Sequence, residues 1–171
     1  MTLQVGRGHE ALRRGRSSCP GAEYFVTCCT GGRAPGLERA EVTSALVAES
    51  NKLADEGVWR MRSAVVMRDH VHLLVALGTK RSLPEAMRLF KGRTSPLLRR
   101  AGLGWQRGYF DHRMRGVEDR LPVFRYIFLN PYRAGLLHDD ARWPGYFCCD
   151  EDWAWFAGLT KDEMPFPEWL M

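Results

Sequence analysis

The sequence predicts an α+β fold, an antiparallel sheet with helices packed on one face. Three observations support this. Apolar, β-branched runs of strand length alternate with segments of helical periodicity, in the order strand, helix, strand, strand, helix, strand, helix. Glycines and turn residues separate these segments. With 171 residues, 45% of them apolar, the chain is long enough to bury a core in one domain. The order of elements is typical of a ferredoxin-like sandwich, the shape of RNA-recognition domains.

The first half of the chain supplies three strands and one helix. Residues 23–30 are aromatic and β-branched and end at paired glycines, which predicts a strand. Residues 37–56 repeat apolar side chains near helical spacing, and a glycine ends this helix. Two further strands are predicted at residues 58–67 and 70–77, with a tight turn or bulge at Arg68-Asp69 between them.

The second half supplies two helices and one strand. The first helix begins at a capping box formed by Ser82 and Glu85, has a proline in its first turn, and ends near Arg100. A strand with flanking loops is predicted within residues 104–115. The last helix is predicted at residues 117–129, although a proline fits poorly in its interior and can mark its true start.

The chain divides into three regions. Residues 1–20 are polar and rich in glycine and arginine, which predicts a loose basic segment. Residues 21–140 form the predicted domain, and residues 141–171 form an acidic, aromatic tail expected to pack on it. No apolar run approaches the roughly 20 residues needed to span a bilayer, and the arginine-rich start lacks the apolar stretch of a secretory signal. We therefore expect a cytoplasmic protein with no membrane partner.

The charge of the chain is uneven. Its net charge is +5, and residues 80–115 are strongly basic, with Glu85 and Asp111 as the only acidic residues. A basic stretch of this kind favours a polyanionic partner, most simply nucleic acid. The alternative is a solvated helix face, but here the positive charge continues beyond the helix into an aromatic segment.

Two histidines lie two residues apart inside the apolar strand at 70–77. Because side chains alternate along a strand, His70 and His72 face the same way while Val71 faces the other. Two imidazoles on one rigid face can bind a metal ion, which would also satisfy polar groups that are costly in an apolar strand. Packing or local hydrogen bonding is the alternative, and the pair alone does not decide between them.

The last predicted helix carries Tyr126 and Asn130, four residues apart and therefore on one face. Two imidazole nitrogens and an amide oxygen suit Mn²⁺ or Mg²⁺. Such an ion would polarise a phosphodiester, and Tyr126 could then attack phosphorus as a covalent nucleophile. Alternatively, Asn130 caps a short helix that starts at Pro131, and Tyr126 is a core tyrosine.

Three motifs carry a resemblance to a known family. Residues 69–75 resemble the histidine–hydrophobic–histidine (HUH) motif of single-strand DNA endonucleases, with Arg68 where relatives often have proline. Residues 105–112 and 126–136 resemble the REP-associated tyrosine transposases, a branch of the single-tyrosine transposases of insertion sequences. The resemblance implies cleavage and rejoining of single-stranded DNA at repeated palindromic hairpins. Tyr126 would form a 5′-phosphotyrosine, and His70, His72 and Asn130 would hold a divalent ion.

Other residues then take expected roles. Basic side chains would neutralise DNA phosphates: Lys91, Arg93, Arg99, Arg100, Arg107, Arg113 and Arg115. Trp105, Tyr109 and Phe110 could stack on unpaired bases, with core packing an equal alternative for Trp105. Asp111 and His112 could orient a metal ligand or the DNA, with surface pairing as the alternative. Tyr109 is a rival nucleophile, but Tyr126 matches the family's Tyr-x-x-x-Asn element.

The leading hypothesis is therefore a metal-dependent, single-strand DNA endonuclease and strand transferase that works as a monomer or homodimer in the bacterial cytoplasm, associated with the nucleoid. One alternative is a non-catalytic nucleic-acid-binding module of ferredoxin-like fold, but the aromatic signature of RNA-recognition domains is missing from the central strands. A metal-dependent phosphodiesterase that activates water is the other alternative, and it would not need Tyr126.

Overall fold

The computed structural model describes residues 18–116, 120–138, 141–159 and 169. Most of the predicted loose N-terminal segment, the predicted start of the last helix at residues 117–119, and residues 160–168 of the predicted tail lie outside these ranges. None of the helices in the described ranges is long and apolar enough to cross a membrane.

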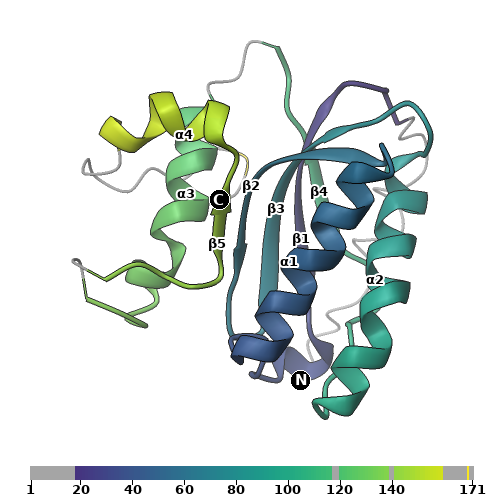
Figure 1. Cartoon of the computed structure of the whole chain (residues 1–171), viewed down its shortest axis with the longest axis vertical. Helices are drawn as coiled ribbons and strands as arrows, with labels where there is room; N and C mark the ends of the chain where they lie inside the picture. Colours follow the sequence, from purple (N-terminus) through teal and green to yellow (C-terminus); the bar gives the residue numbers. More distant parts are fainter. Residues whose placement is uncertain (1–17, 117–119, 139–140, 160–168, 170–171) are drawn as a thin grey trace, which may run out of the picture.

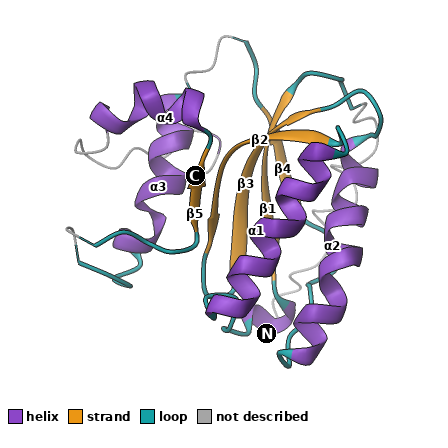
Figure 2. Cartoon of the chain, in the orientation of Figure 1, coloured by secondary structure: helices purple, strands orange, loops and turns teal. Residues whose placement is uncertain are grey.

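The described strands form one antiparallel sheet (Figure 2). They are β1 (Glu23–Cys29), β2 (Trp59–Val66), β3 (His70–Leu77), β4 (Phe110–Arg113) and β5 (Tyr146–Cys148). Their order in the sheet is β4-β1-β3-β2-β5. The first four strands have the arrangement of a ferredoxin-like sandwich, so the predicted α+β fold is confirmed. β5 is an added edge strand beside β2, and the sequence pattern does not predict it.

Helices cover both faces of this sheet. They are α1 (Ala40–Asp55), α2 (Leu83–Arg100), α3 (Leu121–Arg133) and α4 (Asp150–Phe156), with short 3-10 helices at Gly31–Arg33 and Ala157–Leu159. α1 and α2 lie side by side over the sheet, and α3 and α4 lie together, away from that pair (Figure 1). The sequence predicts helices on one face only. This is correct for α1 and α2 but wrong for α3 and α4, which pack against the opposite face.

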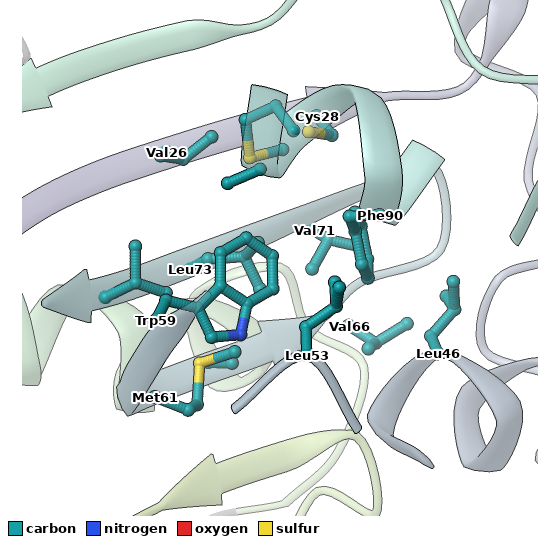
Figure 3. Close-up of a cluster of buried hydrophobic side chains, with 14 of the residues drawn as sticks. Val26, Cys28, Leu46, Leu53, Trp59, Met61, Val66, Val71, Leu73 and Phe90 are labelled. Atoms are coloured by element: carbon teal, nitrogen blue, oxygen red, sulfur yellow. The ribbon is translucent and has the colours of Figure 1, made fainter. Parts of the chain in front are cut away.

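The central strands are apolar on both faces, which explains the two layers of helices. Because side chains alternate along a strand, β1 and β3 each contribute to two hydrophobic clusters. On one face, Val26 and Leu73 pack with Phe90 of α2 (Figure 3). On the other face, Phe25 packs with Phe124 of α3. His70 and His72 lie on the α3 face, since they alternate with Val71 and Leu73 of the first cluster.

α3 differs from its prediction at both ends. It begins at Leu121, so Pro122 lies in its first turn, where proline is tolerated. It continues through Pro131 to Arg133 instead of ending at Leu129. Asn130 therefore lies inside the helix and is not the cap of a separate short helix. Its position one turn after Tyr126 puts both side chains on one face of α3.

α4 is tied to the sheet by an ion network. Arg62 of β2 donates hydrogen bonds to Asp152 of α4 and, at 2.9 Å, to Glu23 of β1. Only 1% of the Asp152 side chain is exposed. Burial opposes ionisation of this carboxyl, but the hydrogen bonds from Arg62, Cys149 and Trp155 together with the charge of Arg62 outweigh it, so the pKa of Asp152 is lowered overall. Arg62 therefore connects three elements through one guanidinium.

The predicted capping box is present at the start of α2, and it supports a test of helix stability. Ser82 Oγ accepts from Glu85 N, and Ser82 N donates to Glu85 Oε2 at 2.8 Å. We expect Ser82→Ala to lower the free energy of unfolding by about 1 kcal/mol, because Glu85 N loses its acceptor, Ser82 Oγ. Urea denaturation measures the change. Ser95→Ala in the same helix is the control and should be nearly neutral, since Ser95 bonds only to the preceding turn.

Candidate functional site

A pocket of about 700 Å³ lies on the α3 face of the sheet. The four residues predicted to carry the chemistry all line it: His70 and His72 from β3, and Tyr126 and Asn130 from α3. The ring centroids of the two histidines are 4.6 Å apart, and those of His72 and Tyr126 are 5.2 Å apart. Two motifs more than fifty residues apart in the sequence thus meet at one place.

His72 is held rigidly at the base of this pocket. It is 4% exposed, and its Nδ1 lies 2.8 Å from the hydroxyl of Thr27 on β1. Its ring stacks on Phe25 with centroids 5.3 Å apart. Burial holds the pKa of His72 well below its usual value, so the ring is neutral near pH 7. Its Nε2 is buried and has no hydrogen-bond partner in the described part of the chain.

His70 is oriented by a carboxylate. Its Nδ1 lies 2.6 Å from Oδ1 of Asp69, and the other oxygen of Asp69 lies 2.8 Å from Nε of Arg33. Burial lowers the pKa of His70, although the hydrogen bond and the charge of Asp69 partly offset this effect. A neutral ring that donates from Nδ1 keeps its lone pair on Nε2. Arg33 and Asp69 therefore set the direction in which His70 can bind a ligand.

These residues fit a divalent metal ion. A buried imidazole nitrogen without a partner is costly, and coordination to a cation would satisfy Nε2 of His72. Histidine ligands usually bind a carboxylate or hydroxyl through their other nitrogen, as His70 does with Asp69 and His72 with Thr27. No group of three or more His, Cys, Asp or Glu suited to a metal occurs in the described ranges. Asn130 lines the same pocket, and its amide oxygen is the third protein ligand that this set of residues could supply.

The pocket also contains residues that the sequence reasoning missed. Arg33 and Arg133 supply its positive charge, and Thr27 and Trp169 form part of the wall. Phe110, which the sequence predicts as a base-stacking residue, also lines the pocket. Arg133 lies seven residues after Tyr126, a spacing that could have placed it on the same helix face. Arg33 lies in a short 3-10 helix with a left-handed φ of 57°, and no sequence pattern points to it.

Two predicted base-stacking residues belong to the core of the opposite face. Trp105 packs against Phe90 with ring centroids 5.9 Å apart, and its Nε1 donates to Thr94 Oγ1. Tyr109 also packs against this cluster. Core packing is thus the role that the structure gives Trp105. Tyr109, the rival nucleophile, does not line the pocket that holds the two histidines.

Asp111 and His112, each predicted to orient a metal ligand or the DNA, lie on opposite faces of β4. The register pairs Asp111 with Val26, which packs under α2, and His112 with Phe25, which packs under α3. Asp111 therefore lies on the wrong face of the sheet to orient His70 or His72. His112 lies on the pocket side, where its ring stacks on Trp169.

The predicted basic residues do not form one surface around the pocket. Lys91 donates to the carbonyl oxygens of Gln106 and Gly108, and Arg93 pairs with Glu49 and Glu56 between α1 and α2. The remaining five are exposed, at the end of α2, in the following loop and along β4: Arg99, Arg100, Arg107, Arg113 and Arg115. Of the seven predicted basic residues, two thus make structural contacts and five are exposed. The arginines that line the pocket are Arg33 and Arg133.

Comparison with known proteins identifies the family of this chain. The model of a family described as "Transposase IS200 like" matches residues 20–128, more than half of the chain and including every strand of the ferredoxin-like core. The chain belongs to the IS200-like transposases. The matched region ends at residue 128, so it includes Tyr126 but not Asn130. No curated protein matches the sequence of this transposase.

Solved structures share its fold. The structure of a REP-associated tyrosine transposase bound to a REP hairpin has a TM-score of 0.66 and 17% sequence identity, with 91% of each chain covered. A putative transposase from Deinococcus radiodurans R1 is 21% identical, with a TM-score of 0.48 over 72% of this chain and 92% of that chain. At this level of identity the first similarity establishes that the transposase has the same fold.

Proposed function

We propose that this transposase is a metal-dependent single-strand DNA endonuclease and strand transferase. The observation that carries the proposal is the meeting of Tyr126, Asn130, His70 and His72 in one pocket. A nucleophile beside a set of neutral nitrogen and oxygen ligands is the arrangement that phosphoryl transfer needs. A module that only binds DNA would not offset the cost of the buried, unpartnered Nε2 of His72, whereas a bound metal ion would.

The proposed reaction is a pair of phosphoryl transfers through a tyrosine. The Tyr126 oxygen attacks phosphorus, the bond from phosphorus to the 3′-oxygen breaks, and the products are a 5′-phosphotyrosine and a free 3′-hydroxyl. The tyrosine proton leaves to solvent, and the departing oxygen takes up a proton. A 3′-hydroxyl that attacks the phosphotyrosine reverses these steps, rejoins the strand and restores Tyr126. The cleavage conserves the bond energy, so no external energy source is needed.

The surrounding residues position these groups. His70, His72 and Asn130 would hold the divalent ion, which when bound supplies charge stabilisation at the phosphate. Arg33 and Arg133 would neutralise the flanking phosphates of the strand. The Tyr126 ring packs edge-on against Phe25, with centroids 5.9 Å apart, and against His72. This packing limits the motion of the nucleophile before DNA binds.

The DNA substrate is a further part of the proposal. The relative of known structure with the same fold is bound to a REP hairpin. We propose that this transposase likewise acts on repeated palindromic hairpins with single-stranded flanks. It would therefore work on chromosomal DNA, in the bacterial cytoplasm and associated with the nucleoid.

A covalent-capture assay tests the proposal. The protein is incubated with single-stranded hairpins from the intergenic repeats of its own genome, with Mn²⁺ or Mg²⁺, and in parallel with a chelator. We expect a denaturation-resistant protein–DNA band that depends on the metal ion. If no hairpin gives this band although the protein binds DNA, the non-catalytic binding module becomes the better account.

The carboxylate behind His70 provides a test of the metal site. We expect Asp69→Ala to weaken Mn²⁺ binding by about 10- to 100-fold, because His70 loses the partner that orients its ring. Isothermal titration calorimetry measures this affinity without DNA. Asp111→Ala is the matched control, since Asp111 lies on the other face of the sheet. Equal affinities for Asp69→Ala and the wild type would mean that Asp69 does not support a metal ligand.

A further inference from the structure

Three aromatic rings stack on one another at β4, and two of them, Phe110 and Trp169, line the pocket that holds the candidate nucleophile. The ring of Trp169 lies on that of His112, with centroids 3.8 Å apart and an angle of 7° between the planes. It is also nearly parallel to Phe110, at 6.4 Å and 15°. Phe110 and His112 come from alternate positions of β4, so both rings project from the same face of the edge strand.

Phe110 is unusual for an aromatic residue in this structure, because 43% of it is exposed. An exposed phenylalanine on an edge strand loses favourable burial energy unless something covers it. Trp169 covers part of it, and Trp169 belongs to the C-terminal end of the chain and to none of the elements that build the sheet. Phe110 and His112, here called the aromatic platform, are thus a surface that accepts a flat heteroaromatic ring.

The aromatic platform lies within reach of the reaction centre. Phe110 and Tyr126 line the same pocket, and the ring of Phe25 lies between them, 6.4 Å from Phe110 and 5.9 Å from Tyr126. Arg33 and Arg133 line this pocket as well. A flat aromatic surface beside cationic side chains matches the chemistry of a nucleotide in single-stranded DNA, with a base to stack and a phosphate to neutralise.

We propose that the aromatic platform binds an unpaired nucleobase of single-stranded DNA next to the phosphate that Tyr126 attacks. The base replaces the Trp169 indole, because both would stack on the same face of Phe110 and His112. The indole is a fused bicyclic ring of about the size of a purine, so the stack seen here shows the shape that the platform accepts. Stacking of this kind tolerates different bases, since every base has a π-face.

This inference deepens the proposed function and rests on it for the position of the scissile phosphate. Its test therefore measures binding in the presence of a chelator, where no metal-dependent cleavage takes place. Two DNAs are compared by fluorescence anisotropy: a hairpin that ends at its base-paired foot, and the same hairpin with a short single-stranded extension there. The extension carries 2-aminopurine, whose fluorescence is quenched when it stacks.

Phe110→Leu is the informative variant, because leucine keeps the apolar character and removes the flat ring. We expect it to bind the extended hairpin about 5- to 100-fold more weakly than the wild type does, with reduced 2-aminopurine quenching. Its affinity for the hairpin without an extension should not change. Phe110→Trp should bind both DNAs as the wild type does. Trp155→Leu is the matched control, an exposed aromatic residue (41%) that lines a different pocket.

Three results would overturn the inference. The wild type could bind both DNAs equally, Phe110→Leu could bind the extended hairpin as tightly as the wild type, or Phe110→Leu could weaken both DNAs alike. Trp169→Ala tests the exchange of indole for base, and it should bind the extension at least as tightly as the wild type. Weaker binding would mean that the base stacks on Trp169 instead of replacing it. If the wild type binds the extended hairpin more tightly but never forms a covalent adduct, the proposed chemistry is wrong and the proposed role of the aromatic platform still holds.

Discussion

Tyr126→Phe abolishes the covalent protein–DNA adduct and lowers the rate of hairpin cleavage by a factor on the order of 10⁶, the size of loss known for removing the nucleophile of a covalent hydrolase. The substitution deletes one hydroxyl group and keeps the ring that packs against Phe25 and His72. We therefore expect the melting temperature and the affinity for hairpin DNA to change little. Single-turnover cleavage with excess protein measures the chemical step directly.

Tyr109→Phe is the matched control for this experiment. Tyr109 lies in a motif that sequence reasoning alone connects with catalysis, yet it packs against the cluster under α1 and α2. Its variant should form the adduct at the wild-type rate. Cleavage by Tyr126→Phe at an undiminished rate would support a phosphodiesterase that activates water. If only Tyr109→Phe loses the adduct, Tyr109 is the nucleophile and the assignment to Tyr126 is wrong.

The second large effect is expected at the histidine pair. In a double variant, His70→Ala with His72→Phe, the affinity for Mn²⁺ should fall by more than the 10- to 100-fold expected for Asp69→Ala. The rate of cleavage should fall as well. Phenylalanine at position 72 fills the space of the buried imidazole and preserves its stacking on Phe25. The fold should therefore survive, and hairpin binding without metal should remain.

Thermal denaturation separates loss of the ion from loss of the fold. A ligand that binds only the native state raises the melting temperature, so Mn²⁺ should stabilise the wild type and not the double variant. His138→Ala, at an exposed histidine far along the chain from this strand, is the control and should respond as the wild type does. An equal shift in the wild type and the double variant would place any metal site elsewhere.

Much of the fold could be predicted because local patterns determine it. The capping box, the two long strands joined by a tight turn and the helical periodicity of α1 and α2 all act within a few residues. The second helical layer was harder to predict. It depends on apolar residues at both alternating positions of β1 and β3, which indicate a sheet covered on both faces. β5 has only three residues, too few for a periodic pattern.

In the candidate site too, the residues placed by local periodicity could be predicted, and those placed by tertiary folding could not. His70 with His72, and Tyr126 with Asn130, could be predicted as pairs because the periods of a strand and a helix place each pair on one face. Trp169 could not be predicted at the pocket, since only tertiary folding brings the C-terminal end there. The charge pattern alone predicted the wrong arginines at the pocket. Arg93 pairs with Glu49 of α1 and with Glu56 directly after it, whereas Arg33, outside the basic stretch, lines the pocket.

The most direct test of the central claim is to identify the residue that carries the DNA. The wild-type protein is incubated with Mn²⁺ and a hairpin, the DNA is digested to a short remnant, and the protein is mapped by peptide mass spectrometry. We predict that the remnant is linked through a 5′-phosphate to Tyr126 and that no linkage forms in the presence of chelator. A remnant on any other residue, or cleavage with every tyrosine unmodified throughout the reaction, would contradict the account.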